Sequence, residues 1–316
     1  MNTKKLFRIF ILFDLIILLA LVFFLVINPE KNSLNETAHS QAPGEFIKLS
    51  DGYVHYELSG PEDGEVVVLV HGFSVPYYVW DPTVEALKLA GFRVLRYDLF
   101  GRGYSDRPLA EYSLDFFVKQ LNQLRTQLIP DQSFHIMGLS MGAPVVAAFA
   151  NQNPDVIKSI TFVAPEVLPV SDKDIFPMNI PVLGEWVVGV YLVPYYLPNS
   201  QMNDFYQPRN YPDWEEKYHV QMQYKGFKRA ILSTIRNLVK YNALDEYRQL
   251  ATAGKPGLLI WGEKDRSISK DAIVELMQVM PGIEYLFVEK AGHLPHYEKP
   301  DQVNPVLINF LQSHSD

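Results

Sequence analysis

The chain has 316 residues, of which 48% are hydrophobic and 20% are charged, and its formal net charge at pH 7 is −8. This length suits one large α/β domain with an insertion, or two domains at most. The acidic balance argues against a nucleic-acid partner, and the lack of cysteine excludes disulfides and thiol chemistry. No group of His, Asp and Glu has the spacing typical of a metal site, so neither a metal nor another cofactor is expected.

The N-terminal segment is a candidate membrane anchor. Residues 6–27 form a mostly apolar run, which as a helix would span about 33 Å and cross a bilayer core. A cleavable signal peptide has a shorter apolar region and a nearby small-residue site. We therefore expect an uncleaved transmembrane signal anchor, with cleavage near residues 38–40 as the alternative. Lys4, Lys5 and Arg8 lie at its start, which predicts a cytosolic N-terminus and an extracytoplasmic remainder.

Strands and helices alternate after a polar, aperiodic stretch, residues 28–44, that predicts a linker. This βαβ order predicts a mostly parallel, doubly wound α/β sheet formed by residues 45–165 and 251–316. We expect strands at 46–49, 53–58, 66–70, 93–97, 134–139, 157–163, 258–261 and 285–288, and helices at 82–89 and 113–128.

The alternation stops at about residue 165 and resumes at Gly257, so residues 166–250 predict an inserted helical cap. The first part is rich in Pro, Tyr, Trp and Leu, and residues 218–250 predict amphipathic helix. The aromatic side chains of this insertion allow two interpretations. Most of them would pack the cap onto the core, while a minority would line a lipophilic pocket or a membrane-facing lid.

The most informative motif is Gly138-Leu139-Ser140-Met141-Gly142, which lies between a strand-like run and a helix-like run. A serine flanked by glycines at this spacing indicates a nucleophile elbow, in which a tight turn exposes the hydroxyl above the sheet. Side chains at the glycine positions would collide with the neighbouring strand or helix. The motif predicts Ser140 as a nucleophile.

Partners for this serine follow in the order that the elbow requires, an acid and then a histidine. Asp265 and His293 each come directly after a strand-like run. His293 would take the proton of Ser140, and Asp265 would orient the imidazole and stabilise its charged form. The backbone N–H groups of Met141 and of Phe73, in the turn after the strand at 66–70, would form the oxyanion hole.

These motifs together resemble the alpha/beta hydrolase fold family, and within it the cap-bearing, serine esterase and lipase-like branch. The resemblance covers residues 45–316 and includes His71-Gly72-Phe73 and the stretches at 98–105, 262–265 and 292–300. It implies a helical cap inserted between the sixth and seventh core strands, where it would cover the serine and shape the substrate pocket.

Several residues compete for these roles. His296 lies three positions after His293, but the Gly-His pair at a strand end favours His293. Glu166 follows the sixth strand, a position that some relatives use for the acid, and Glu263 neighbours Asp265; Asp265 is the prediction that we retain. His71 is expected to form a structural hydrogen bond, the stretch at 98–105 to fix a loop, and Ser74 is a candidate substrate contact.

Serine at the elbow narrows the range of possible reactions. It disfavours dehalogenase and epoxide hydrolase activity, because those enzymes of this fold need a carboxylate nucleophile. We expect hydrolysis of small-molecule carboxylic esters through an acyl-serine intermediate. The predicted membrane anchor favours a lipid-like substrate such as a monoacylglycerol. Two alternatives stay open: a carbon–carbon bond hydrolase that uses the same triad, and a non-catalytic ligand-binding receptor that retains it.

Overall fold

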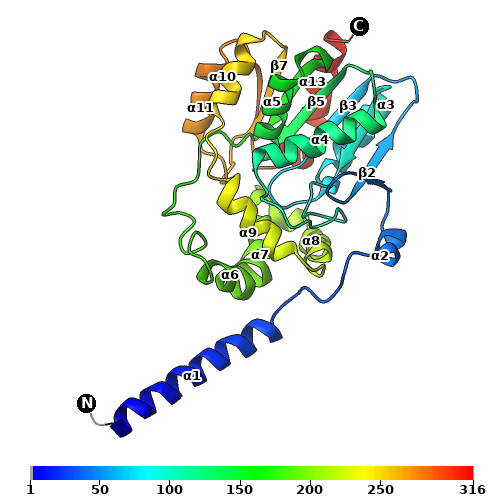
Figure 1. Ribbon diagram of the computed structural model, residues 1–316. Helices are drawn as coiled ribbons and strands as arrows, with labels where there is room; N and C mark the ends of the chain where they lie inside the picture. The colour runs from blue at the N-terminus through cyan, green and yellow to red at the C-terminus, as the bar shows by residue number, and fades with distance from the viewer. Residues whose placement is uncertain (1–2, 316) are drawn as a thin grey trace.

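The computed structural model describes residues 3–315, so that Asp316, the last residue of the predicted core, lies outside it. Its centre is an eight-stranded sheet in the order β1-β2-β4-β3-β5-β6-β7-β8 (Figure 1). The strands are β1 (Glu45–Lys48), β2 (Tyr53–Ser59), β3 (Val66–Val70), β4 (Arg93–Tyr97), β5 (Phe134–Leu139), β6 (Ile157–Val163), β7 (Gly257–Gly262) and β8 (Glu284–Val288).

The sheet is mostly parallel, as the sequence predicts. Strands β4, β3, β5, β6, β7 and β8 pair in parallel, whereas β2 runs antiparallel to both β1 and β4. All five residues of β3 are buried, which explains why this strand is continuously apolar rather than alternating. Because the central strands are parallel, their carboxyl ends meet at one edge of the sheet.

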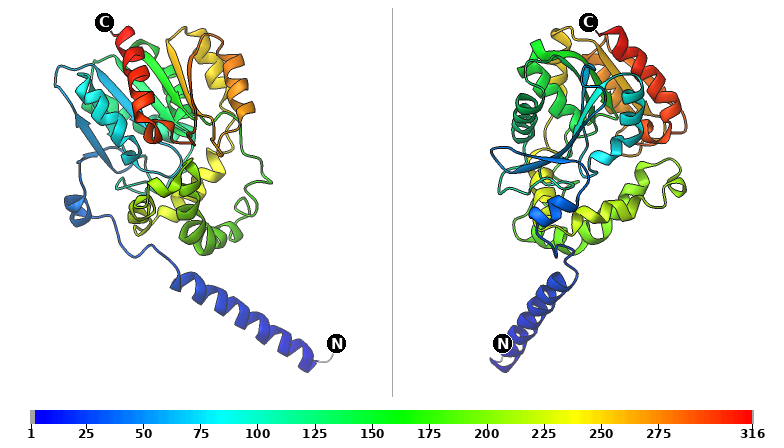
Figure 2. Two further views of the ribbon diagram at one scale, coloured as in Figure 1. Left: turned by 180° about the vertical axis from the view of Figure 1, so that it is seen from behind. Right: turned by 90° about the vertical axis from the view of Figure 1, so that its right-hand side faces the viewer.

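Helices cover both faces of the sheet (Figures 1 and 2). Helices α4, α5, α10 and α11 lie on one face, and α3 and α13 pack against each other on the opposite face. Their bounds are α3 (Asp81–Leu89), α4 (Leu114–Leu128), α5 (Gly142–Gln152), α10 (Leu244–Thr252), α11 (Lys270–Val279), α12 (Pro295–Glu298) and α13 (Pro300–Ser313), with the short turns η1 (Tyr77–Trp80) and η2 (Pro154–Val156) between them.

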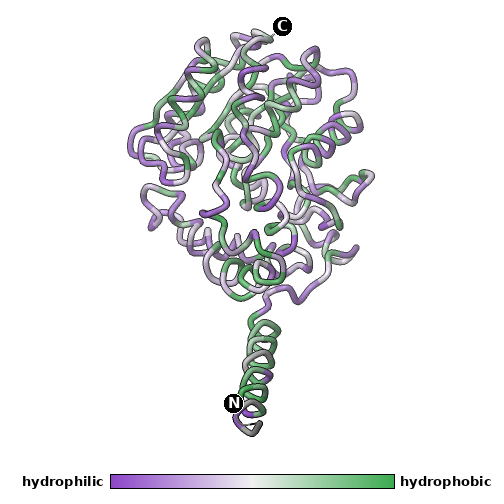
Figure 3. Tube along the Cα trace, turned by 60° about the vertical axis from the view of Figure 1, so that its left-hand side comes forward, coloured by the Kyte–Doolittle hydropathy of each residue, from purple (hydrophilic) through white to green (hydrophobic). Residues whose placement is uncertain are grey.

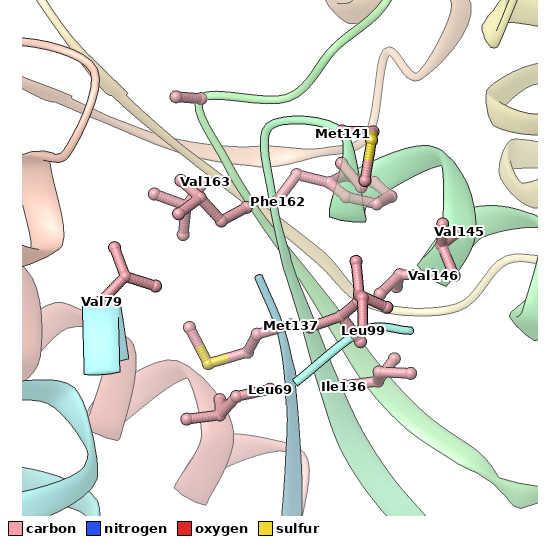
Figure 4. Close-up of a cluster of buried hydrophobic side chains, with 14 of the residues drawn as sticks. Leu69, Val79, Leu99, Ile136, Met137, Met141, Val145, Val146, Phe162 and Val163 are labelled. Carbon is pink, nitrogen blue, oxygen red and sulfur yellow. The ribbon is translucent and has the colours of Figure 1, made fainter. Parts of the chain in front are cut away.

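The core beneath the serine turn is tightly packed and apolar. Figure 4 shows Met137 of β5, Phe162 of β6 and Val146 of α5 among the buried side chains that surround this turn. Met141, whose side chain is fully buried, belongs to the same cluster. The close packing of this cluster therefore restrains the turn and holds Ser140 in one orientation.

Residues 164–256 separate β6 from β7 and contain a group of helices near the sheet edge that faces the N-terminal helix (Figure 1). Residues 218–250, which predict amphipathic helix, are helical in three separate stretches. Gly226 adopts a φ of 96°, a left-handed conformation that ends helical hydrogen bonding, and the chain turns again at 238–243. The elements are α6 (Leu183–Val187), η3 (Val188–Tyr196), α7 (Leu197–Gln201), η4 (Met202–Asp204), η5 (Pro208–Asn210), α8 (Trp214–Met222), α9 (Phe227–Asn237) and then α10.

The N-terminal segment forms the long helix α1 (Thr3–Val26), which projects from the rest of the molecule (Figure 1). By length and composition, its residues Phe7–Val26 could cross a membrane, as a signal sequence or as an anchor. The stretch after it is ordered. It includes the short helix α2 (Glu36–Gln41) and an isolated parallel bridge between Asn32 and Tyr224, just before α9.

Candidate active site

The predicted site residues follow strand ends that adjoin one another in the sheet. Val70 of β3 pairs with Gly138 of β5, and Leu139 pairs with Val163 of β6. The turn containing Phe73 and the turn containing Ser140 therefore begin side by side. β7 and β8 continue the same edge, and Asp265 and His293 come from the loops after them.

The serine turn has the geometry of a strained elbow. Ser140 has a φ of 52°, which a non-glycine residue adopts at a cost of order 1–3 kcal/mol. Its N–H donates to the carbonyl of Val163 at 2.9 Å, and its carbonyl accepts from the N–H of Ala143 at 2.9 Å. A Cβ at Gly138 would lie 2.6 Å from the carbonyl oxygen of Gly142, so the sequence spacing has a direct steric cause.

His293 and Asp265 form a hydrogen-bonded pair. Nδ1 of the imidazole lies 3.0 Å from Oδ2 of the carboxylate. The second oxygen of Asp265 accepts backbone N–H groups from Ser267 at 2.8 Å and Ile268 at 3.0 Å. These bonds fix the carboxylate, so Nδ1 of His293 carries the proton and Nε2 is free to accept one.

The electrostatics of the pair follow from burial and from neighbouring carboxylates. Desolvation alone would lower the pKa of His293, but the negative charges of Asp265, Asp204 and Glu166 outweigh it and raise the pKa to about 9. Burial likewise opposes ionisation of Asp265, but His293 and the two backbone donors lower the pKa of Asp265 below its ordinary value. The pair therefore stabilises the charged imidazolium.

The two predicted oxyanion donors have free N–H groups. Within residues 3–315, no hydrogen bond uses the N–H of Phe73 or that of Met141. The carbonyl of Phe73 is held by Nε of the buried Arg102 at 2.8 Å, and Nη2 of Arg102 donates to Thr234 of α9 at 2.8 Å. This arginine fixes the turn in front of Ser140 and ties it to the inserted segment.

Ser140 and His293 line the same cavity, of about 540 Å³, which we call the catalytic cavity. Within the described part of the chain no hydrogen bond joins their side chains, and such bonds are often long before substrate binds. Ser74, the candidate substrate contact, also lines this cavity, where its hydroxyl accepts a hydrogen bond from Gln201 of α7 at 3.3 Å.

A second cavity of about 610 Å³ meets the first at Ser140, and we call it the apolar lobe. The two share Ser140 and Phe73 from the core, Tyr196 and Leu197 from the inserted segment, and Arg266 and Ser267 from the loop after β7. The apolar lobe is lined mainly by aliphatic side chains, which include Val167, Leu168, Val170, Ile175, Met178, Leu192, Ile235 and Val239. Ser140 therefore stands between a more polar chamber and an apolar one.

The competing histidines have structural partners. Nε2 of His296 lies 3.1 Å from the carbonyl of Val79, and burial lowers the pKa of His296 to about 3. His71 accepts the N–H of Leu99 at 2.9 Å, and burial lowers its pKa to about 4, so it remains neutral. Neither histidine has the carboxylate contact that His293 makes.

The competing acids are also distinguished by their surroundings. Glu263 is exposed and bonds to Lys264. Glu166 lines the apolar lobe, and burial raises its pKa to about 8, so this carboxyl group is mostly neutral at pH 7. Of these three candidates, Asp265 is the one that directly contacts His293.

Asp204, which the sequence analysis did not single out, joins the site from the inserted segment. Its carbonyl accepts the N–H of His293 at 2.7 Å, its carboxylate accepts the hydroxyl of Ser267 at 3.1 Å, and it lines the catalytic cavity. Nothing around this residue in the sequence marks it, because its position depends on the insertion folding back over the His293 loop. Arg266, exposed at the junction of the two cavities, directly follows Asp265 in the sequence, but no motif there marks it as a site residue.

Among the described residues, no three His, Asp or Glu side chains are arranged to hold a metal ion. The chemistry available to this site is that of a hydroxyl, an imidazole, carboxylates and backbone N–H groups. These are the components of acyl transfer through a covalent intermediate.

Comparison with known proteins identifies the family to which the fold belongs. A model of the alpha/beta hydrolase fold family matches residues 65–300. The chain belongs to this family. The hydrolase is 25% identical to 2-hydroxy-6-oxononadienedioate/2-hydroxy-6-oxononatrienedioate hydrolase 1 of Dechloromonas aromatica, over 89% of this chain and 99% of the relative.

Two further similarities involve proteins with other hydrolytic activities. The hydrolase is 26% identical to Lipase 1 of Psychrobacter immobilis, over 78% of this chain and 77% of the lipase. Its structure matches that of the enol-lactonase from Burkholderia xenovorans LB400 with a TM-score of 0.73 and 21% identity, covering 85% of this chain and 100% of the lactonase. The fold is therefore shared across several hydrolytic reactions, and the site must decide among them.

Proposed function

We propose that this hydrolase is a serine carboxylesterase with lipase-like specificity, acting through an acyl-serine intermediate. Ser140 is the nucleophile, His293 the general base and acid, and Asp265 the residue that orients the imidazole. The observation that carries the proposal is the strained Ser140 turn on the same cavity as His293, whose Nδ1 lies 3.0 Å from Asp265. This arrangement supports an acyl-transfer mechanism that uses a serine, a histidine and a carboxylate.

The reaction begins when a substrate carbonyl lies beside Ser140. His293 takes the hydroxyl proton at Nε2 as the oxygen attacks, and the charge that develops on the carbonyl oxygen is met by the N–H groups of Phe73 and Met141. His293 then gives its proton to the departing alcohol. A water molecule repeats the sequence, with His293 as base, and releases the acid.

The two cavities support a substrate with one apolar and one polar end. We infer that the acyl chain occupies the apolar lobe, where aliphatic side chains replace water, and that the alcohol portion occupies the catalytic cavity. In this proposal residues 166–250 act as the cap, since Tyr196 and Leu197 from this segment line both cavities. A monoacylglycerol has the required shape.

We further infer that α1 remains as a signal anchor, with the N-terminus in the cytosol and residues 45–316 outside it. The length and apolar composition of α1 support this, as do the exposed side chains of Lys5 and Arg8 at its start. Sequencing the N-terminus of the membrane-extracted protein tests it. An intact Met1 supports an anchor, and a new N-terminus near residues 38–40 contradicts it.

A fluorophosphonate probe tests the catalytic proposal, because it labels an activated serine. We expect labelling of the wild-type chain and none of Ser140→Ala. Turnover of p-nitrophenyl esters of increasing chain length should favour acyl chains longer than acetyl. Absence of Ser140-dependent labelling would contradict the mechanism and favour the receptor alternative. A preference for acetyl over all longer chains would contradict the lipid-like specificity.

Carbon–carbon bond hydrolysis is the second candidate, and Arg266 is the observation that favours it. This guanidinium lines both cavities at Ser140, where it could bind the carboxylate of a 2-hydroxy-6-oxo-dienoate. Loss of the absorbance of such a dienoate measures the reaction directly. Turnover faster than that of the best ester would replace the esterase proposal.

A further inference from the structure

The inserted segment carries a concentrated apolar and aromatic surface. Half of the large apolar side chains that the described structure exposes outside α1 lie between residues 176 and 196. They include Phe176, Val182, Trp186, Tyr191, Tyr195 and Tyr196, and we call this surface the aromatic face. Exposed apolar patches of this kind mark contact surfaces rather than ordinary solvent-facing surface.

The aromatic face is attached to α1. The ring of Phe24 packs so closely on Gly189 of η3 that a Cβ at this glycine would lie 2.2 Å from the ring carbon Cε2. Nζ of Lys228, at the start of α9, lies 4.6 Å from the centre of the same ring. The last turns of the apolar helix are therefore beside the inserted segment, as Figure 3 shows for the hydrophobic N-terminal helix below the folded part.

The stretch after α1 is fastened to the same segment. Glu30 accepts the backbone N–H of Lys228 at 2.6 Å. The N–H of Asn32 donates to the carbonyl of Gln223 at 2.9 Å, and its own carbonyl accepts from Lys225 at 2.8 Å. Few residues separate Val26 from these bonds, so the folded part is held close to the end of α1 and cannot turn freely about it.

The composition of the aromatic face suits a lipid surface. Trp and Tyr are the side chains enriched where protein meets the head-group layer of a membrane. Two carboxylates in or near the segment are paired: Glu185 lies 2.6 Å from Arg236, and Asp172 lies 2.6 Å from Lys240. Because α1 ends beside the aromatic face, a bilayer that holds α1 would also contact this face.

The aromatic face is continuous with the active-site cavities. Tyr196 is half exposed on the face, and it also lines both the catalytic cavity and the apolar lobe. Met178, near the other end of the segment, lines the apolar lobe as well. An acyl chain that leaves a membrane at this face would reach Ser140 along apolar side chains.

We propose that the aromatic face rests in the head-group layer of the membrane that holds α1, and that lipid esters enter the apolar lobe from the bilayer beside Tyr196. The entry route rests on the proposed esterase function and on α1 as an anchor. The contacts of Glu30 and Asn32 act as a clamp that sets the orientation of the hydrolase on the membrane.

Trp186 supplies a direct probe of this docking. It is 39% exposed, whereas Trp80, Trp214 and Trp261 are 0%, 2% and 7% exposed. The full-length chain is reconstituted in phosphatidylcholine vesicles, with and without lipid brominated near the top of its acyl chains, and compared with Trp186→Phe. We expect the brominated lipid to quench most of the emission that this substitution removes.

Two results would overturn the docking. Quenching of Trp186 by aqueous iodide but not by brominated lipid would place the face in water. Protection from both quenchers would indicate contact with a second copy of the chain. Fluorophosphonate labelling of the same vesicles distinguishes failure of the docking proposal from failure of the catalytic proposal. If the face does not dock, Ser140 is still labelled. If Ser140 is not catalytic, labelling is absent while brominated lipid still quenches Trp186.

Activity on bilayer substrates tests the entry route. Tyr191 and Tyr195 are exposed on the face and lie outside both cavity linings, so Tyr191→Ser combined with Tyr195→Ser should lower turnover of vesicle-borne monoacylglycerol several-fold and leave a soluble short-chain ester unaffected. Tyr285→Ser, at a similarly exposed tyrosine on β8, is the matched control. Equal effects on both substrates, or no effect on either, would contradict the route.

The clamp is tested by insertion. Ten glycine and serine residues placed after Ile27 separate α1 from Glu30, whereas the same insertion after Leu34 leaves the clamp joined to α1. We expect the first insertion to abolish quenching of Trp186 by brominated lipid and the second to preserve it. The same quenching in both variants would show that the clamp does not orient the hydrolase.

Discussion

The backbone N–H of His293 donates to the carbonyl of Asp204 at 2.7 Å, so the inserted segment holds the loop of the candidate catalytic histidine. Gly292 permits this approach, since a Cβ there would lie 2.3 Å from the same carbonyl oxygen. Glu298 adds a second connection, because its carboxylate accepts the N–H groups of Gly292 at 2.5 Å and of Tyr206 at 2.8 Å. Folding of the insertion and positioning of the base are therefore coupled.

The pH dependence of the reaction should report the charge of Asp204. Its carboxylate is one of three that raise the pKa of His293, and the base must be neutral to accept a proton from Ser140. Activity is thus lost as pH falls through the pKa of His293. Asp204→Asn removes one negative charge, lowers that pKa, and should move the acidic limb of the kcat/KM profile to lower pH.

A matched control for this shift is Asp155→Asn, which removes an exposed carboxylate before the first residue of β6, at the opposite edge of the sheet. We expect its pH profile to superimpose on that of the wild type. An unmoved limb in Asp204→Asn would mean that this carboxylate contributes to the structure of the loop and not to the protonation of His293.

Asp265→Asn should lower kcat/KM by about 10⁴-fold, because an amide in place of the carboxylate favours the wrong imidazole tautomer. Glu166→Gln should cost far less, since burial raises the pKa of Glu166 to about 8 and the group is mostly neutral at pH 7. Glu263→Gln, at an exposed position, should have no more than a small effect. A larger loss of kcat/KM in Glu166→Gln than in Asp265→Asn would make Glu166 the acid of the triad.

The sheet was largely predictable, and the limits of prediction have physical causes. Periodicity and turn residues located all eight strands. The helix expected at 113–128 corresponds to α4, which Ser113 caps: its hydroxyl accepts the N–H of Phe116 at 3.3 Å. The inserted segment was not predictable in detail, because apolar residues follow a helical period in α9 and not in α8. Residues 223–226 separate the two helices, and the last of them, Gly226, has a left-handed backbone that the periodicity does not mark.

The site was predictable where residues adjoin strand ends and not where they come from the insertion. Ser140 and His293 lie in loops whose relative positions are set by the parallel sheet, so motif and order were sufficient. Asp204 and Tyr196, which both lie in the inserted segment, reach the catalytic cavity through long-range packing. Neighbouring sequence gives no signal for such contacts.

The glycine after the elbow serine should be required for stability. A Cβ at Gly142 would lie 2.5 Å from the carbonyl oxygen of Val70 and 2.6 Å from that of His71, both of which are backbone atoms. Gly142→Ala must displace β3 or the elbow, so we expect it to lower the free energy of unfolding by about 1–3 kcal/mol and to slow fluorophosphonate labelling. Urea unfolding followed by tryptophan fluorescence measures the first effect.

Gly282→Ala is the control for this substitution, because a Cβ at that position meets no atom within 4 Å. Its unfolding free energy should stay within about 0.5 kcal/mol of the wild-type value. Equal stability of the two variants would mean that the elbow relaxes to accept a side chain, and the steric account of this glycine would be wrong.

The apolar lobe should set the acyl-chain length. Val170 lines this lobe, and its N–H donates to the carbonyl of Val239 at 3.0 Å, a bond that a substitution of the side chain leaves in place. Val170→Phe fills part of the lobe, so kcat/KM for long-chain p-nitrophenyl esters should fall by roughly tenfold or more, while short-chain esters are hydrolysed as before. Val274→Phe, at an exposed position on α11, should change neither. If Val170→Phe lowers turnover of all chain lengths equally, the acyl chain lies elsewhere and the lobe has another role.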